Sequence, residues 1–169
     1  MKTKIVSLVA ASMLLAGSLN AGEKFISVGY ASADTNGVTS TGVSLDLGAK
    51  FGETFKHTIG TKFIFLGEND DWTDGQGNLG DIYYSLGYEV LPSTIVAGKV
   101  GMGYQSLGSV GTGQNSTAAY AIGLSYGASL TYELSDSFDV GASYTKNDLS
   151  FDSVDYSVDV IEAHLAFKF

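Results

Sequence analysis

Bulky apolar residues alternate with small or polar residues along most of the chain, and the pattern is clearest in the last nine positions. Successive side chains of a β-strand point to opposite faces, so a period of two predicts a strand with one apolar and one polar face. No stretch after residue 21 keeps the period of about 3.6 residues that an amphipathic helix shows. At the carboxyl end the two faces are Ile161, Ala163, Leu165, Phe167 and Phe169 against Glu162, His164, Ala166 and Lys168.

The alternation continues through eight segments and predicts an all-β fold, an eight-stranded antiparallel up-and-down transmembrane β-barrel. Each segment is about nine residues or longer, the length of a tilted strand that crosses a membrane. In the last segment Tyr156, Val158 and Val160 are out of phase with Ile161 and the residues that follow, which predicts a β-bulge near 160–161. The predicted strands are 24–33, 40–52, 56–66, 81–90, 94–106, 119–134, 138–146 and 155–169.

The connections between these segments alternate between short and long. Short periplasmic turns and longer extracellular loops are typical of bacterial membrane barrels. The lone proline, Pro92, falls in a short connection, where its missing N–H removes no ladder hydrogen bond. The predicted short connections are 52–55, 91–93 and 135–137, and the predicted long ones are 34–39, 67–80, 107–118 and 147–154.

Alternation alone does not say which face points outward, because a soluble carrier barrel has its apolar face inside. The small face favours a membrane barrel, since an eight-stranded lumen has room only for small side chains and closely paired charges. A soluble periplasmic barrel remains the alternative. We expect the charges to form a paired network that fills the lumen, with a narrow channel as the other possibility. The predicted lumenal charge network is Asp46, Lys50, Lys62, Glu89, Lys99, Glu133, Glu162 and His164.

The amino-terminal residues predict export from the cytoplasm. Lys2 and Lys4 precede an apolar stretch at 5–15 that is too short to span a bilayer as a helix, and small residues follow it. This is the pattern of a signal peptide, predicted over 1–21, with a barrel domain over 22–169. Loss of the two lysines would change the formal net charge from −9 to −11.

The carboxyl end resembles the closing strand of small OmpA- and OmpX-type outer-membrane barrels, because the chain stops on an aromatic residue after strict alternation. The resemblance implies that Leu165, Phe167 and Phe169 form a C-terminal signal read by the barrel assembly machinery. The usual glycine near its start is Ala163 here. The resemblance also implies location in the cell outer membrane after passage through the periplasm, as a monomer in contact with membrane lipid and lipopolysaccharide.

The amino-acid composition argues against some classes of binding partner. The chain has no arginine and a net charge of −9, so nucleic acid is not an expected partner. It has no cysteine for a disulfide or a lipid anchor. Aromatic residues near the strand ends are expected to form girdles at the two membrane interfaces. These are Phe51, Phe55, Tyr132, Phe138, Phe167 and Phe169 at the turn side, and Tyr30, Phe65, Tyr104, Tyr120, Tyr144 and Tyr156 at the loop side.

Two features of the sequence are candidates for site chemistry. The acidic segment 68–81 partly fits a calcium-loop register, but Trp72 occupies a ligand position and no helices flank it, so we expect a solvated loop. The more specific alternative is that this loop weakly binds Ca²⁺ or Mg²⁺, which would bridge it to lipopolysaccharide phosphates. His57 and His164 both fall near the turn side, and neither has a serine in the spacing of the deacylase barrels.

We therefore expect no catalytic, cofactor-binding or metal-binding residues. The favoured function is a non-catalytic outer-membrane protein with a structural or surface-interaction role. The alternatives are a narrow channel for small solutes and, less favoured, an enzyme that modifies lipid A.

Overall fold

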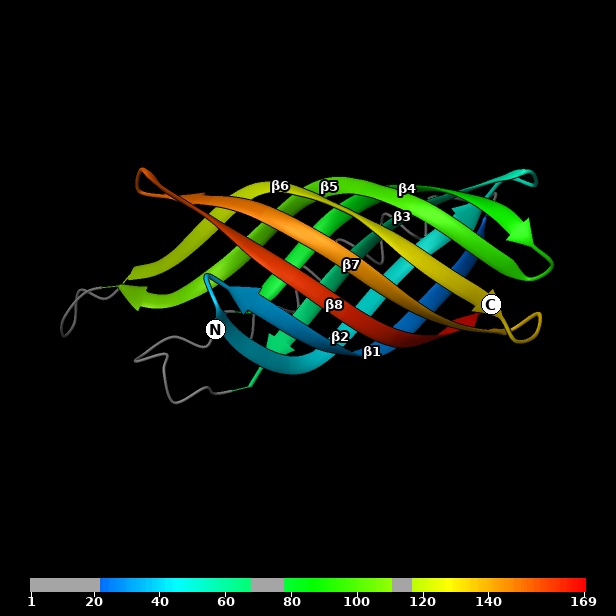
Figure 1. Cartoon of the computed structure of the whole chain (residues 1–169), viewed down its shortest axis with the longest axis horizontal. Coiled ribbons are helices and arrows are strands. Elements are labelled where there is room, and N and C mark those ends of the chain that lie inside the picture. The colour runs from blue at the N-terminus through cyan, green and yellow to red at the C-terminus, as the bar shows by residue number, and fades with distance from the viewer. Residues whose placement is uncertain (1–21, 68–77, 111–116) are drawn as a thin grey trace.

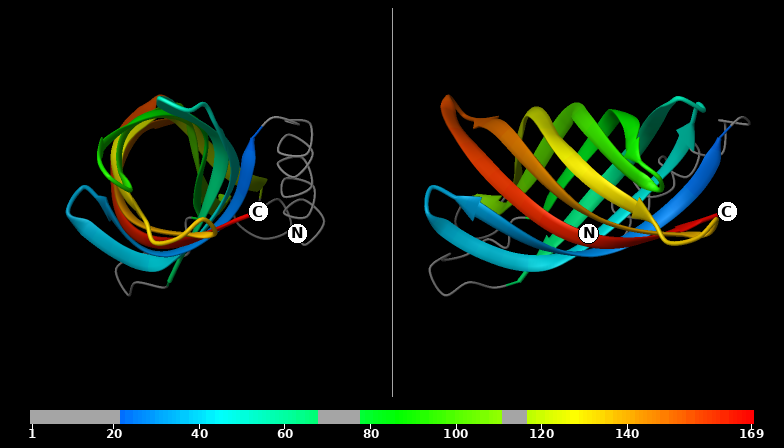
Figure 2. Two further views of the ribbon diagram at one scale, coloured as in Figure 1. Left: turned by 90° about the vertical axis from the view of Figure 1, so that its right-hand side faces the viewer. Right: turned by 45° about the vertical axis from the view of Figure 1, so that its right-hand side comes forward.

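The computed structural model describes residues 22–67, 78–110 and 117–169. They form a closed barrel of eight strands in chain order (Figure 1), seen as a ring along its axis in the left view of Figure 2. Every neighbouring pair is antiparallel, so the predicted eight-stranded up-and-down barrel is confirmed. Among the described residues, no helix has the length and apolar character to cross a membrane. The strands are β1 (Glu23–Thr35), β2 (Val38–Phe51), β3 (Phe55–Leu66), β4 (Leu79–Leu91), β5 (Thr94–Val110), β6 (Thr117–Glu133), β7 (Phe138–Phe151) and β8 (Val154–Lys168).

The barrel closes where β1 pairs with β8. The N–H of Lys24 donates to the carbonyl of Phe169 at 3.1 Å, and the N–H of Phe169 donates to the carbonyl of Lys24 at 2.9 Å. The start of β1 and the end of β8 therefore lie at one end of the barrel, with the turns after β2, β4 and β6. We call this the terminus end and the opposite end the loop end. All strands run obliquely between the two (Figure 1).

Two connections predicted as long loops are tight turns. Asn36 and Gly37 join β1 to β2 with φ of 53° and 86°, and Asp152 and Ser153 join β7 to β8 with φ of 46° and 70°. Positive φ at both central residues is the hairpin geometry that matches the twist of the flanking strands. The predicted loops 34–39 and 147–154 are therefore wrong, because the strands continue up to these turns. At the loop end, β3 and β4 are joined by 67–78, and β5 and β6 by 111–116.

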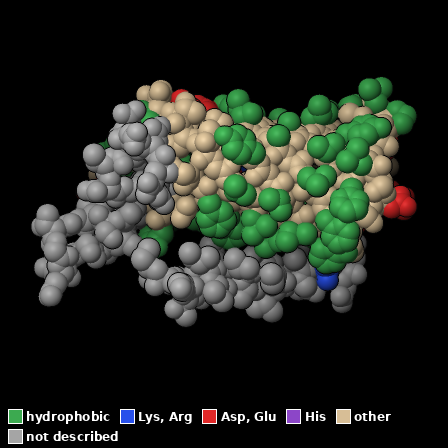
Figure 3. Space-filling view, turned by 90° about the horizontal axis from the view of Figure 1, so that it is seen from below, with side chains coloured by type: hydrophobic (Ala, Val, Ile, Leu, Met, Phe, Trp, Pro, Cys, Tyr) green, Lys and Arg blue, Asp and Glu red, His purple; other side chains and the backbone are tan. Residues whose placement is uncertain are grey.

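The apolar side of the alternation faces outward over most of the barrel. On β4, Tyr84 and Tyr88 are 39% and 51% exposed, whereas Tyr83 between them is 7% exposed. The same contrast runs along β5 to β8, and Figure 3 shows hydrophobic side chains spread over one side of the outer surface. So many exposed large hydrophobic side chains are unfavourable in water, so the exterior is suited to a hydrocarbon solvent.

Near the loop end the two faces of β7 and β8 exchange character. Leu149 and Val158 are 1% and 0% exposed inside the barrel, while their neighbours Asp148 and Asp159 point outward. The register of β8 with β1 and with β7 is uninterrupted through Val160. The predicted bulge is therefore wrong: the backbone keeps its phase, and the apolar face changes sides because this part of the strand meets a different solvent.

The inward apolar side chains near the loop end form one cluster, which we call the loop-end plug. It joins residues from six strands, so it closes the barrel interior from most sides. Its buried members are Ala31, Ala33, Ile64, Leu79, Ala121, Leu149, Val158 and Val160, with Leu66, Phe151 and Tyr156 packed against them.

Candidate functional site: the lumen

The middle of the lumen is occupied by charged side chains in close pairs. Lys62 from β3 forms an ion pair with Glu162 from β8, and its Nζ lies 3.6 Å from Oδ2 of Asp46. Ser44 donates to Oε1 of Glu162 at 2.5 Å, and Ser143 donates to Oε2 at 3.0 Å. The Glu162 side chain is 1% exposed. A carboxylate at this depth is stable only when donors satisfy its oxygens, as they do here.

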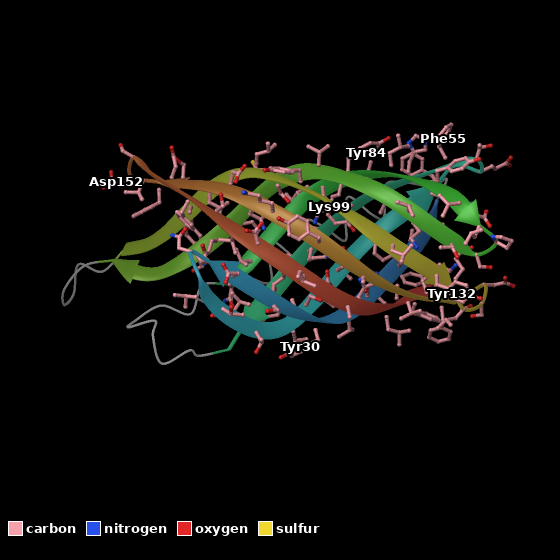
Figure 4. The ribbon with its side chains drawn as sticks, in the orientation of Figure 1. Tyr30, Phe55, Tyr84, Lys99, Tyr132 and Asp152 are labelled. Atoms are coloured by element: carbon pink, nitrogen blue, oxygen red, sulfur yellow. The ribbon has the colours of Figure 1, made fainter. Side chains whose placement is uncertain are left out.

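A second pair lies on β4 and β5. Nζ of Lys99, which lies within the barrel in Figure 4, is 2.6 Å from Oδ2 of Asp81 and 4.8 Å from the ring centroid of Tyr83. The hydroxyl of Tyr83 donates to the carboxylate of Asp46, with distances of 3.0 and 2.8 Å to its two oxygens. Ser125 donates to Oδ2 of Asp81 at 3.2 Å. The Tyr83 hydroxyl and ring thus connect this pair to the one around Lys62.

A third group lies nearer the terminus end. Asp139, whose side chain is fully buried, has Nζ of Lys50 at 2.5 Å and Nζ of Lys168 at 2.9 Å. Lys168 also lies 3.4 Å from Oε1 of Glu133 at the rim. The ammonium of Lys50 stands 5.5 Å from the ring centroid of Phe25, an added favourable contact for a cation removed from water. We call these three groups together the central ion network.

The structure brings most of the predicted charged residues together. Five of the eight lie in the central ion network with the partners given above: Asp46, Lys50, Lys62, Lys99 and Glu162.

The other three are placed differently. Glu133 stands at the rim with 32% of its side chain exposed. His164 lines a lumenal cavity, and its buried Nδ1 has no hydrogen-bond partner within the described residues. Glu89 was predicted to enter the lumen but is exposed, and its carboxylate accepts the N–H of Ser93 at 2.9 Å. The prediction that it joins the lumenal network is wrong. Glu89 is paired in register with buried Ile95 and so keeps the inward phase of β4, but it lies at the terminus-end rim beside the turn, where its side chain is exposed.

Three members of the network were missed from the sequence: Asp81, Asp139 and Lys168. The alternation contains the signal for the last two, because Asp139 precedes outward Val140 and Lys168 lies between outward Phe167 and Phe169. With them, four lysines face four carboxylates in the described part of the lumen. These are Lys50, Lys62, Lys99 and Lys168 against Asp46, Asp81, Asp139 and Glu162.

Two small cavities border the network. The one on its terminus side has a volume of about 80 Å³ and is lined by polar groups that include Ser27 and His164. Oγ of Ser27 and Nδ1 of His164 are buried without a partner, and a polar cavity of this volume can hold the water molecules that would satisfy them. The other, of about 10 Å³, lies between the network and the plug, with Lys62 on one side and Val160 on the other.

Aromatic side chains gather at the terminus end, where Figure 4 shows Phe55 and Tyr132. The ring of Phe167 lies 5.3 Å from that of Phe138 and 5.9 Å from that of Phe169, measured between centroids. At the other side Tyr30, Phe65, Tyr120 and Tyr144 are exposed on the outer face.

One residue of the predicted girdle is wrongly placed. Tyr156 points into the barrel, packs against the plug and donates its hydroxyl to Oε1 of Gln105 at 2.8 Å. It belongs to the part of β8 where the apolar face has turned inward.

The metal hypothesis rested on the segment 68–81, of which 68–77 lie outside the described residues. Asp81, the last residue of that segment, is a lumenal partner of Lys99. Within the described part of the chain, no group of three or more His, Cys, Asp or Glu side chains is arranged to hold a metal ion.

A closed eight-stranded barrel with an apolar exterior and paired charges inside is the architecture of a small transmembrane β-barrel. The chain belongs to the family described as outer membrane protein beta-barrel domain, whose model matches residues 6–169. The predicted location in the outer membrane and the resemblance to small outer-membrane barrels are confirmed. The predicted signal peptide, 1–21, lies outside the described residues.

Solved structures show the same fold at low sequence identity. Ail, the attachment invasion locus protein of Yersinia pestis, is 19% identical over 88% of this chain and 99% of its own, with a TM-score of 0.63. Neisserial surface protein A is 15% identical over 87% and 96%, with a TM-score of 0.61. The N-terminal barrel of Pseudomonas aeruginosa OprF is 12% identical over 88% and 99%, with a TM-score of 0.55. None of the curated proteins compared with the chain matches it.

Proposed function

We propose that this protein is a non-catalytic, non-conducting barrel that anchors in the outer membrane and presents its loop end as an interaction surface. The observation that supports this most directly is the loop-end plug above the central ion network. Ions that enter from the terminus end would meet paired charges and then a layer of apolar side chains around Leu149 and Val158, which are 1% and 0% exposed. An ion crossing that layer would lose its hydration without gaining a partner.

A channel for small solutes is the second candidate, and the cavities argue against it. The cavity of about 80 Å³ has room for only a few water molecules, and the one of about 10 Å³ ends against Ile64, Leu79 and Val160. Conduction through the described interior would require both the network and the plug to rearrange.

The geometry of the histidines gives little support to an enzyme that modifies lipid. Nδ1 of His57 lies 2.6 Å from the hydroxyl of Tyr84, and the His57 ring stacks on Phe51 at 5.2 Å, both near the terminus end. His164 faces the lumen. A nucleophile activated by a histidine needs the two side chains within hydrogen-bond reach, and neither histidine has a serine at that distance among the described residues.

A surface role is supported by the exposed polar loop end. At its described positions this end is acidic, with Asp34, Asp148, Asp152, Asp155 and Asp159 (Asp152 is marked in Figure 4). Ail, a structural neighbour, is described as an attachment invasion locus protein and has been solved with a heparin analogue, sucrose octasulfate. Like charges repel, so we propose that this chain favours a basic partner over a sulfated polyanion.

Planar-bilayer recording tests the closed state. The wild-type protein should give no unitary current steps. The variant Leu149→Ser, Val158→Ser, combined with Lys62→Ser and Glu162→Ser, should give them, because water could then enter both the plug and the central ion network. The paired control is Leu124→Ser, Leu130→Ser on the outer face, which should stay silent. Regular current steps from the wild-type protein would favour the channel instead.

Binding of labelled basic and sulfated polymers to cells that display the barrel tests the surface role. Deletion of the protein should reduce the binding of polylysine-type probes and leave that of heparin-type probes unchanged. Equal binding of both probes with and without the protein would contradict the proposal.

A further inference from the structure

Gly98 faces outward and has no packing reason to be glycine. Inside the barrel, glycines allow close approach: a Cβ on Gly127 would lie 2.0 Å from the carbonyl oxygen of Tyr144. A Cβ on Gly98 would meet no atom within 4 Å, and its backbone is not in the left-handed region. The missing side chain therefore leaves open space on the outer surface of the barrel.

This space is the floor of a shallow, wide-open apolar depression on β4 to β7. Gly98 is paired in register with Ala128, so two small residues lie side by side at the bottom. The tyrosine rings stand higher, and Tyr84, Tyr126 and Tyr144 are 39%, 38% and 45% exposed. The side chains around the floor are Tyr84, Leu86, Val100, Tyr126 and Tyr144.

A lysine borders the depression on the side of the loop end. Lys146 is paired in register with Tyr126 and follows Tyr144 by two positions on β7, so it shares their outward face. It forms no ion pair with any residue that the structure describes. The outward face of β7 is apolar from Phe138 to Tyr144 and polar from Lys146 onward, so this ammonium lies at the boundary of the apolar band.

The carboxylates beside Lys146 have other partners. Asp159, its register neighbour on β8, accepts the hydroxyl of Tyr144 at 2.5 Å. Asp148 accepts the hydroxyls of Tyr126 at 3.1 Å and Ser157 at 2.7 Å. Tyr126 and Tyr144 are thus held as walls of the depression, and neither carboxylate forms an ion pair with the ammonium of Lys146 within the described residues.

We propose that the depression and Lys146 together bind an outer-leaflet lipid of the lipid A type, which has a phosphate on its head group and several acyl chains. The loop end is the outer side of a barrel whose other end has only short turns, so Lys146 lies at the level of outer-leaflet head groups. Its ammonium would contact the phosphate, and one acyl chain would lie over Gly98 and Ala128.

The acyl-chain contact and the phosphate contact contribute differently to the affinity for the lipid. An acyl chain gains no hydrophobic energy by moving from the bilayer to the depression, so this contact contributes packing alone. An exposed ammonium and phosphate attract each other by an amount that corresponds to about a two- to fivefold change in binding. The charge should therefore set the preference for a phosphorylated lipid, and the depression should add about a further twofold.

Native mass spectrometry of the full barrel with bisphosphorylated lipid A, the same lipid without phosphates, and phosphatidylglycerol tests the proposal. The wild-type protein should retain bisphosphorylated lipid A most strongly. Lys146→Gln should lower this by about two- to fivefold, and Gly98→Leu by about twofold. Controls are Lys24→Gln, which removes an equal charge at the terminus end, and Val28→Leu, which adds bulk to the outer face of β1. Neither control should change retention.

A variant that should increase lipid binding provides a second test. Asp159→Asn removes a carboxylate that opposes the phosphate, so it should raise retention of bisphosphorylated lipid A. A decrease would mean that a cation bridges the carboxylate and the phosphate, and it would overturn direct binding by Lys146. Equal retention by Lys146→Gln and Lys24→Gln, equal retention of lipid A with and without phosphates, or a dimer in place of a lipid complex would also overturn the proposal. Heat-dependent gel mobility confirms that each variant is folded.

Discussion

Lys62 and Glu162 are 100 residues apart in the sequence and form a buried ion pair that joins β3 to β8 across the lumen. Neither strand is a neighbour of the other in the barrel wall. The pair therefore ties opposite parts of the wall together through the interior, in addition to the backbone ladder that runs around it.

Replacing Glu162 with Gln should destabilise the barrel by about 3 kcal/mol, because the ammonium of Lys62 would be left buried with Asp46 at 3.6 Å as its remaining anion. Urea unfolding in detergent micelles, followed by gel mobility without boiling, measures the effect. Glu53→Gln in the exposed turn after β2 is the matched control. An unchanged midpoint for Glu162→Gln would show that the pair contributes no net stability.

An arginine in place of Leu124, which is 53% exposed on the outer face of β6, should cost about 2–4 kcal/mol. The cost arises because the guanidinium would lie in hydrocarbon. Folding yield into lipid vesicles measures it, with Asp136→Arg in the turn after β6 as a control. Equal yields would indicate that this face does not meet lipid.

The aromatic ring of Phe169 should matter for assembly apart from the backbone of that residue. Deleting Phe169 removes both the ring and two backbone hydrogen bonds to Lys24, whereas Phe169→Ala removes only the ring. If Leu165, Phe167 and Phe169 form the assembly signal that we propose, both changes should lower the amount of barrel in isolated outer membranes. Normal insertion of Phe169→Ala, with loss only on deletion, would assign the role to the seam hydrogen bonds instead.

Alanine substitutions at two glycines should differ in their effect on the stability of the barrel. Gly127→Ala places a methyl group where the carbonyl oxygen of Tyr144 lies 2.0 Å away, and the resulting shift of the strands should cost about 1–3 kcal/mol. Gly98→Ala places it in open space and should change stability by less than about 0.5 kcal/mol. Urea midpoints of the two variants decide this, and a larger loss for Gly98→Ala would contradict the assigned faces.

The sequence predicts the fold well because alternation is a local property. Ile82, Tyr84, Leu86 and Tyr88 are recognisable as one outer face without knowledge of any other strand. The assignment of faces also leads to most of the lumenal charges, since they share the side opposite to the bulky residues.

The partners of those charges are not local, and this limits what the sequence can predict. Which carboxylate Lys62 contacts depends on the register of β3 and β8 around a closed ring. Asp81 is predicted both as the first residue of the strand 81–90 and as the end of the acidic segment 68–81, because alternation does not reveal that β4 begins at Leu79 and places Asp81 inside the barrel. The out-of-phase Tyr156 and Val160 predict a bulge only if one solvent surrounds the whole strand, whereas the apolar face of β8 turns inward near the loop end.

The exchange of faces on β7 and β8 also limits how far the barrel can shift along the membrane normal. If the protein sank toward the terminus side, the outward carboxylates Asp148 and Asp159 would enter hydrocarbon. If it rose, the exposed rings of Tyr126 and Tyr144 would leave the bilayer for water. Both displacements raise the free energy, so the residues of β7 and β8 determine how deeply the barrel sits in the bilayer. In a bilayer of different thickness, the lipid around this hairpin should deform before the barrel moves.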